Sequence, residues 1–330
     1  MRFFRNSRTT ERGGSLFQVR SGDAAASCAL LILLLAPLLS FAATPRPKIP
    51  AELEALIELS HSAPPEFAAD ALLRIVESGR IADRDTKREL IEQAFQLATR
   101  AQQPVRLVSI PGTPIDTRAG YRGRAMRLGL DALSLECRAI RDLLPLDKPR
   151  ARELFTNIVK PALEPRTCED ALVYDVDDFY QTLQQVLAAA FTPAEREKDE
   201  QVQFLTLHLS RITAHAELAP AARIVAGQGL TPAQLQVAEG AFLARLESMP
   251  SDDRSFSVAV APLEQSVSML AQSLSSAGLA TDGLVGGFHK YLTANLSGAR
   301  CGDNAGAMTR TSEPAKVVEW FNSQFHGDTP

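Results

Sequence analysis

The chain has 330 residues, of which 45% are hydrophobic, 22% charged and 6% aromatic, a composition typical of a globular protein with an aliphatic core. The formal charge is -4, and residues 1–42 carry five Arg and two acids, so the remaining residues carry -7. An acidic body argues against a general nucleic-acid-binding protein, which would show a basic stripe.

The N-terminal segment has the order of a secretory signal peptide. Arginines come first, an uncharged run over 24–43 that contains "CALLILLLAPLL" follows, and "SFAATP" ends it. This order predicts a signal peptide over 1–42, with Ser40 and Ala42 at the -3 and -1 positions. An uncleaved membrane anchor over 24–43 is the alternative, because such a run can span a bilayer of about 30 Å. In both cases we expect an exported body, either periplasmic or secreted, or anchored in the inner membrane outside the cytoplasm.

Helical periodicity dominates the rest of the chain. We expect an N-terminal helical piece over 43–103, a Pro-rich connection over 104–116, and a main helical body over 117–330 that ends in a short helix. The predicted fold is all-α, an irregular multi-helix array or α-solenoid-like body of roughly ten to twelve helices. Thr-Pro pairs begin some of the helices and glycines end others. The clearest helical segments are 65–79, 87–101, 125–144, 192–212, 231–247, 263–278, 283–298 and 312–325.

The segment "RTCEDALVYDVDDFYQ" over 166–181 predicts the start of a helix. Thr167 and Asp170 match the Ser/Thr-x-x-acid capping pattern, and the apolar residues that follow recur at steps of four and three. The acids at 175, 177 and 178 fall off that apolar face, and their spacing does not fit a calcium-binding EF-hand loop. The best strand candidate of the whole chain is "VRLVSIPG" over 105–112, within the Pro-rich connection.

Three cysteines follow the predicted signal peptide. Cys137 occupies a core position of a predicted helix, where a thiol behaves as a small hydrophobe. Cys168 and Cys301 lie in predicted connections, so in an oxidising compartment we expect a disulfide between them. A bridge through Cys137, or three free thiols, are the alternatives, because sequence alone does not fix connectivity. The acidic neighbours of Cys168 argue against a thiolate nucleophile.

Four arginines crowd the early turns of a predicted helix in "DTRAGYRGRAMR": Arg118, Arg122, Arg124 and Arg127. Cations are disfavoured at a helix N-terminus, so these side chains need partners. Asp131 is a favourable partner for Arg127 at i+4. The others either pair across the fold with the acidic run at 169–178, form an anion-binding face for phosphate or a polyanionic polymer, or are solvated.

Common catalytic and metal-binding motifs do not occur in the sequence. There is no P-loop, G-x-G-x-x-G, G-x-S-x-G, HExxH or Cys-x-x-Cys. His208 and His215 are expected on one helix, about 10.5 Å apart, which is too far for both to bind one metal ion. We therefore predict no catalytic residue, no metal site and no cofactor.

At "TCEDALVYDVDDFY", "DTRAGY" and "LSGARCGDN" the chain is similar to a family of exported all-helical bacterial proteins of acidobacterial type, whose function is unknown. This resemblance implies an exported helical protein and adds no activity. We expect a non-catalytic interaction or scaffold protein of the cell envelope, with another envelope protein or a polymer as its partner. Nucleic acid is not expected as a partner, and the membrane only through an uncleaved N-terminal segment.

Two alternatives to a scaffold remain from the sequence. One is an extracytoplasmic hydrolase without a local motif, which would need a cleft joining Arg118 or Arg122 to carboxylates with shifted pKa values. The other is a small-anion-binding protein that uses the face from Arg118 to Arg127.

Overall fold

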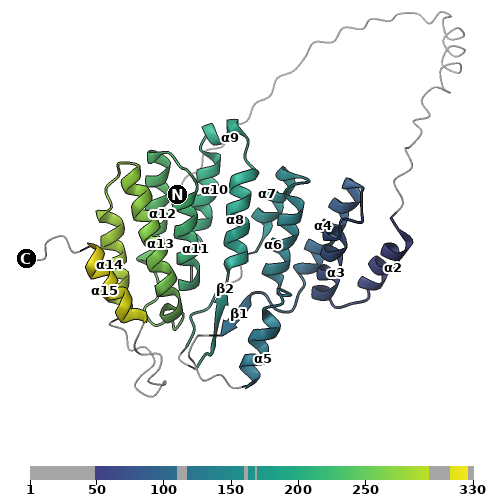
Figure 1. Cartoon of the computed structure of the whole chain (residues 1–330), viewed down its shortest axis with the longest axis horizontal. Helices are drawn as coiled ribbons and strands as arrows, with labels where there is room; N and C mark the ends of the chain where they lie inside the picture. Colours follow the sequence, from purple (N-terminus) through teal and green to yellow (C-terminus); the bar gives the residue numbers. More distant parts are fainter. Residues whose placement is uncertain (1–48, 110–116, 160–162, 168, 297–312, 326–330) are drawn as a thin grey trace, which may run out of the picture. The chain divides into compact units, whose positions relative to one another are not determined.

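The computed structural model describes residues 49–109, 117–159, 163–167, 169–296 and 313–325. Residues 47–330 form one compact unit, and its described part is mostly helical with one two-stranded sheet (Figure 1). This confirms the prediction of an all-α multi-helix body. The predicted signal peptide lies outside the described residues. The helices are α2 (Ala51–Ser60), α3 (Pro65–Glu77), α4 (Arg84–Ala98), α5 (Thr117–Met126), α6 (Ala132–Leu143), α7 (Lys148–Asn157), α8 (Asp177–Ala189), α9 (Pro193–Glu197), α10 (Glu200–Leu209), α11 (His215–Gly227), α12 (Pro232–Leu246), α13 (Phe256–Ser276), α14 (Asp282–Leu296) and α15 (Glu313–Phe325).

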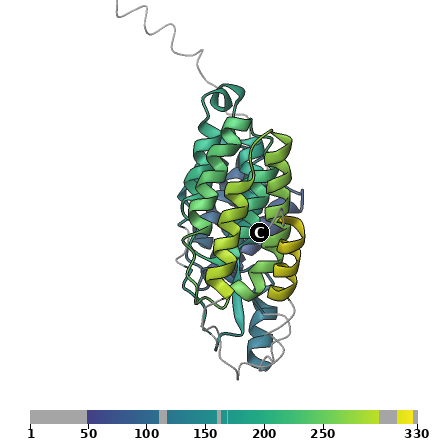
Figure 2. The same cartoon turned by 90° about the vertical axis from the view of Figure 1, so that its left-hand side faces the viewer.

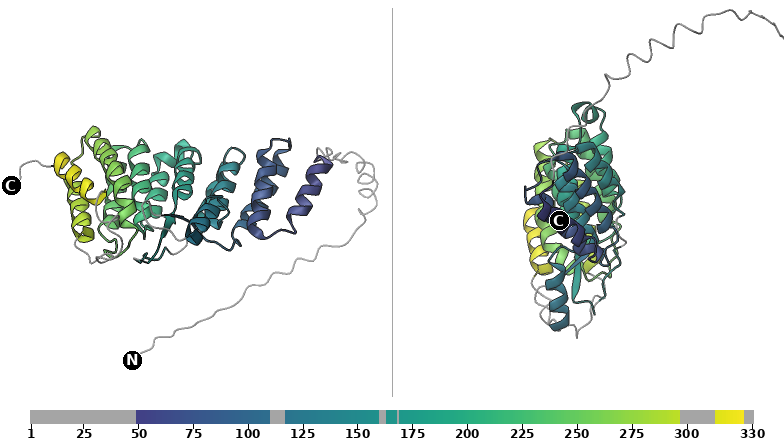
Figure 3. Two further views of the ribbon diagram at one scale, coloured as in Figure 1. Left: turned by 60° about the horizontal axis from the view of Figure 1, so that its bottom comes forward. Right: turned by 90° about the vertical axis from the view of Figure 1, so that its right-hand side faces the viewer.

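The helices of this unit pack in two layers (Figure 3). In the first layer α4, α6, α8, α11, α13 and α15 contact one another in succession, and in the second α10 contacts α12, which contacts α14. The pairs α6–α7, α11–α12 and α13–α14 connect the layers as helical hairpins. Helices that pack mainly on their near neighbours are the arrangement of an α-solenoid.

Apolar packing is densest between α11 and α13. Small residues of α11, such as Ala221 and Ala222, are fully buried and allow the two helix backbones to approach closely. Leu263 and Leu270 of α13 are also fully buried in the same apolar core. The same apolar core is continuous and includes buried residues of α3 and α4 at the other end of the unit.

Strand β1 (Arg106–Ser109) pairs antiparallel with β2 (Leu172–Asp175), with Arg106 opposite Asp175 and Ser109 opposite Leu172. The strand candidate at 105–112 is therefore a strand over 106–109, and 110–112 lie outside the described residues. Helix α5 packs on β1, and both views show α5 and the ribbon beyond the ends of α6 and α8 (Figures 1 and 2). We call α5 and the two strands the α5 arm. Across the Pro-rich connection, α4 also packs directly on α6.

The helix predicted over 166–181 was wrong in its first half. The backbone N–H of Thr167 donates to the Asp170 carboxylate at 2.8 Å, as in a capping box, but this contact closes a turn. Leu172 to Asp175 then form β2, and α8 begins only at Asp177. Pairing with β1, a partner distant in sequence, overrides the local helical pattern.

The helix predicted over 125–144 is not continuous, because 125–126 are the last residues of α5 and α6 begins only at Ala132. Between the two helices, Gly129 takes a left-handed conformation with φ of 67°. Asp131 is the N-cap of α6, and its carboxylate accepts from the backbone N–H of Ser134 at 3.1 Å. Arg127 follows the end of α5 and Asp131 precedes α6, so the predicted i, i+4 pair within one helix was wrong.

The segment 192–212 divides at Asp199, whose φ is 60°, into α9 and α10. His208 lies in α10 and His215 begins α11, so the prediction of both histidines on one helix was wrong. The prediction for 231–247 was accurate, since Thr231 forms a capping box with Gln234 and Pro232 takes the first helical position.

Candidate functional site

The α5 arm carries the arginines that the sequence singles out. Gly123 is buried where α5 meets the ribbon, and a Cβ there would lie 3.0 Å from Ser109 Oγ and 3.5 Å from Leu172 Cδ2. Glycine therefore allows the helix to approach the ribbon closely. The Tyr121 side chain, in the same helix, is 71% exposed.

The structure places Arg118, Arg124 and Arg127 at exposed positions in or just after α5. The side chain of Arg122 lies outside the described residues. Arg124 lies in the last turn of α5, where a cation is favoured by the helix dipole. Three of the four arginines are thus accessible to solvent, while an anion-binding role for them stays a prediction.

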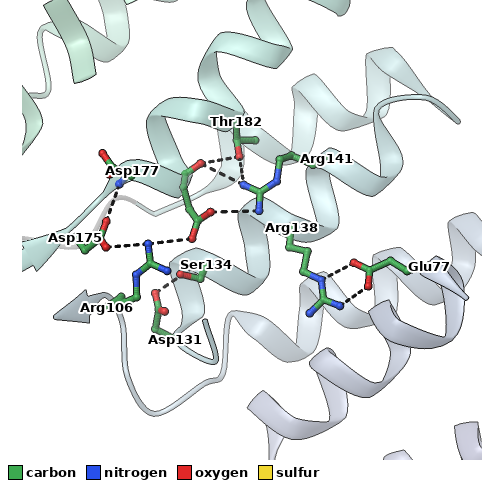
Figure 4. A network of polar contacts seen from close by, with 10 residues as sticks. Glu77, Arg106, Asp131, Ser134, Arg138, Arg141, Asp175, Asp177 and Thr182 are labelled. Atoms are coloured by element: carbon green, nitrogen blue, oxygen red, sulfur yellow. Dashed lines mark hydrogen bonds and ion pairs between the residues drawn. The ribbon is translucent and has the colours of Figure 1, made fainter. Parts of the chain in front are cut away.

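A network of ion pairs joins the arm to the helical layers (Figure 4). The Arg106 guanidinium lies 2.9 Å from the Asp175 carboxylate and 3.5 Å from that of Asp178. Arg141 of α6 pairs with Asp178 at 3.3 Å, and its Nη1 donates to Thr182 Oγ1 at 2.8 Å. Asp178 thus links an arginine of β1 to an arginine of α6, and it fixes the arm against α6 and α8.

The prediction that the α5 arginines pair with the acidic run at 169–178 does not match the partners described there. Asp170 pairs with Arg166, and Asp177 with Arg223. Antiparallel register brings Arg106 to Asp175, so this carboxylate is paired within the ribbon itself. Sequence reasoning missed Arg106 and Arg141 because both become partners of the run only through the strand pairing and the α6–α8 contact.

Two buried polar atoms of this network have no hydrogen-bond partner among the described residues: Arg106 Nε and Asp131 Oδ1. The two side chains face each other in Figure 4. Burial raises the pKa of the Asp131 carboxyl, and the Arg106 charge acts against that rise.

Carboxyl groups with raised pKa values lie along α6. Burial, together with the charge of Asp131, raises the pKa of Glu136 to about 7. Burial and the neighbouring Glu77 carboxylate raise the pKa of Asp142 to about 7 as well. Glu77 is held by Arg138, whose two nitrogens donate to it at 2.6 Å each. Open grooves lie on the surface of α4, between α7 and α10, and along α11 and α13. Neither Glu136 nor Asp142 lines any of these grooves.

Cys137 is fully buried in α6, as predicted, and burial raises the pKa of its thiol. A thiol held protonated in this way is a poor nucleophile. Cys168 and Cys301 lie outside the described residues, so their disulfide stays a prediction.

His215 is buried at the start of α11. Its Nε2 lies 2.9 Å from the Pro250 carbonyl, which can only accept, so Nε2 carries the proton. Nδ1 then accepts from the Tyr291 hydroxyl at 2.7 Å. The described residues contain no group of three side chains that could hold a metal ion.

An open groove of about 640 Å³ lies between α7 and α10. A second, of about 600 Å³, runs along α11 to α13 and is lined by uncharged residues, including Leu230 and Met269. Sequence reasoning did not find the first groove, although the signal was present. Leu207 of α10 is an exposed apolar residue off the face that α10 buries, whereas the neighbouring Phe204 is half-buried and packs against the core.

Comparison with family models, curated proteins and solved structures finds no match. Across the described residues, every helix is too short or too polar to cross a membrane, and the apolar run at 24–43 lies outside them.

Proposed function

We propose that the chain is a non-catalytic exported protein of the cell envelope that binds a partner through its helical surfaces. The observation that carries this proposal is the layered packing, in which helices contact mainly their neighbours and leave outward faces free. Such stacks provide extended binding surfaces in many scaffold proteins. Large apolar side chains lie exposed on several of these faces: Leu56, Leu59, Leu207 and Met269.

A pull-down from the envelope fraction tests the interaction. We expect the tagged full chain to recover one reproducible protein or wall polymer, and a tagged chain unfolded by Leu263→Asp to lose it. Recovery of the same background from both chains would contradict the proposal.

Export and the Cys168–Cys301 disulfide are part of the same proposal, and they rest on the order of the N-terminal segment and on the cysteine positions. A non-reducing peptide map with a thiol count after denaturation tests both. We expect cleavage after Ala42, a linked pair of peptides containing Cys168 and Cys301, and one free thiol at Cys137. Three free thiols would mean that the body stays reduced or that the bridge is wrong.

A second candidate function is small-anion binding by the α5 arm. It is supported by the exposure of Arg118, Arg124 and Arg127 on an element that the Arg106–Asp178–Arg141 network fixes in place. Phosphate, sulfate and citrate should then raise the melting temperature, and Arg124→Ala or Arg118→Ala should remove the rise. Arg80→Ala is the matched control, because Arg80 is an exposed arginine that pairs with Glu52. Equal shifts in all variants would show a general salt effect.

A further inference from the structure

Helix α7 and the second-layer helices α10, α12 and α14 are here called the outer helices, and they pack least closely between α7 and α10. From α10 onward each outer helix packs directly on the next, whereas α7 packs mainly on α6 and α8. The groove of about 640 Å³ lies between α7 and α10. Two aromatic side chains line it, Phe191 and Phe204, and their ring centroids lie 5.5 Å apart.

Each wall of the groove is one face of a helix. On α7 the lining residues are spaced i, i+3, i+4 and i+7, and on α10 the spacing is the same. Both walls therefore run straight for two helical turns, about 10.5 Å. The α7 wall consists of Pro149, Arg152, Glu153 and Thr156, and the α10 wall of Glu200, Gln203, Phe204 and Leu207.

The charges on the walls favour a basic partner. Arg152 is already occupied, because its guanidinium lies 4.6 Å over the Phe191 ring and 2.7 Å from the Glu195 carboxylate. Glu153 pairs with Arg150 at 2.8 Å and still keeps more than half of its side chain exposed. With Glu200 on the opposite wall, each wall presents one carboxylate to the groove.

From these features we propose that the α7–α10 groove binds an amphipathic helix of a partner protein, with an apolar stripe flanked by Lys or Arg. The apolar stripe packs on Phe204 and Leu207, and the basic side chains reach Glu153 and Glu200. A helix bound along this open groove buries Leu207, which is 41% exposed. This is helix-in-groove recognition, in which anchors at i, i+3 or i+4, and i+7 carry the contact. The inference rests on the proposed interaction function and names the class of partner.

A displayed library of helical peptides, randomised along one face, tests this assignment on the full chain. Peptides selected on the wild type are measured by fluorescence anisotropy against Leu207→Gln and against Val237→Gln. Val237 is the matched control, since it is an exposed apolar residue on the neighbouring outer helix α12. We expect Lys- or Arg-flanked apolar stripes, with affinity reduced about tenfold or more by Leu207→Gln and unchanged by Val237→Gln.

Charge reversal gives an independent readout. The double variant Glu153→Lys, Glu200→Lys should change the selected flanks from basic to acidic, since both residues lie at the groove and neither is in the core. All variants are compared only where their melting temperature equals that of the wild type.

Peptides that are insensitive to Leu207→Gln, or that carry acidic flanks on the wild type, would overturn the groove assignment. The interaction function would stand in that case if the envelope pull-down still recovers a partner. Failure of the selection together with a partnerless pull-down would overturn both.

Discussion

Two joints of this molecule are held by different forces. The α11–α13 joint is mainly apolar, with alanines and leucines packed between the helices and Arg223 Nη1 donating to Ser266 Oγ at 3.5 Å. The joint of α6, α8 and the α5 arm is held instead by Arg106, Arg141 and the carboxylates around them. Apolar packing is insensitive to pH, whereas an ionic joint depends on the protonation of each member. The second joint is therefore where solution conditions can change the structure.

The largest effect is expected in the apolar joint. Leu263→Ala removes a fully buried side chain of α13 and should lower the free energy of unfolding by about 3 kcal/mol. Urea unfolding measures this loss, which should be the same at pH 5.5 and pH 8. A loss that changes with pH would show that charge also contributes to this joint.

Removing the central carboxylate of the ionic joint is expected to come next. Asp178→Asn leaves Arg106 and Arg141 with fewer compensating charges and should cost about 2 kcal/mol. Asp177→Asn is the control, because this carboxylate is mostly exposed and 3.8 Å from Arg223, so its loss should cost below about 0.5 kcal/mol. Equal costs for the two neighbours would mean that the network contributes no more than a surface pair.

The pH dependence of stability should come from the buried carboxyls of α6, one of the helices at this joint. The pKa of Glu136 is raised to about 7 in the folded protein from an ordinary 4.5. Above pH 4.5 the unfolded chain loses this proton and the folded chain keeps it, so the free energy of unfolding falls as pH rises to about 7 and then levels. Glu136→Gln should flatten this slope and raise stability at pH 8 by on the order of 1 to 2 kcal/mol. An unchanged slope from pH 4.5 to 8 would assign the dependence to other groups, with Asp142→Asn as the next variant.

The smallest change in global stability is expected from Gly123→Leu. The larger side chain cannot fit against Ser109 and Leu172, so α5 should separate from the ribbon. Because α5 contacts mainly β1, we expect faster amide hydrogen exchange in the arm and a change below about 1 kcal/mol in global stability. Protection that stays at the wild-type level in residues 117–126 would contradict the close packing of the arm.

Local sequence signals predicted the helices whose ends are encoded locally. Thr231 and Pro232 gave the start of α12, and the apolar spacing in 87–101 gave α4. The 125–144 prediction failed although its signal was local. Gly129 and Asp131 are a glycine stop and an N-cap in sequence, but apolar residues at steps of three and four continue through them.

The ribbon and its network could not be predicted locally. β2 forms because β1 lies beside it, and α5, α6 and α7 intervene in sequence. The residues that matter at the arm, Arg106 and Arg141, acquire their partners through this distant pairing. The α7–α10 groove is similar, since the helical spacing of each wall is visible in the sequence but their juxtaposition is not.

The most direct test of a partner-binding role is site-specific photo-crosslinking in intact cells. A photoreactive residue is placed at Leu207, with a second chain carrying it at Val237 as the control. We expect one defined adduct from position 207, with a partner segment that is an amphipathic, basic-flanked helix, and a weaker adduct or none from position 237. If photoreactive residues at Leu207, at Tyr121 of the arm and at Met269 of the second groove all give no defined adduct, this result contradicts the central claim that the helical body binds a partner.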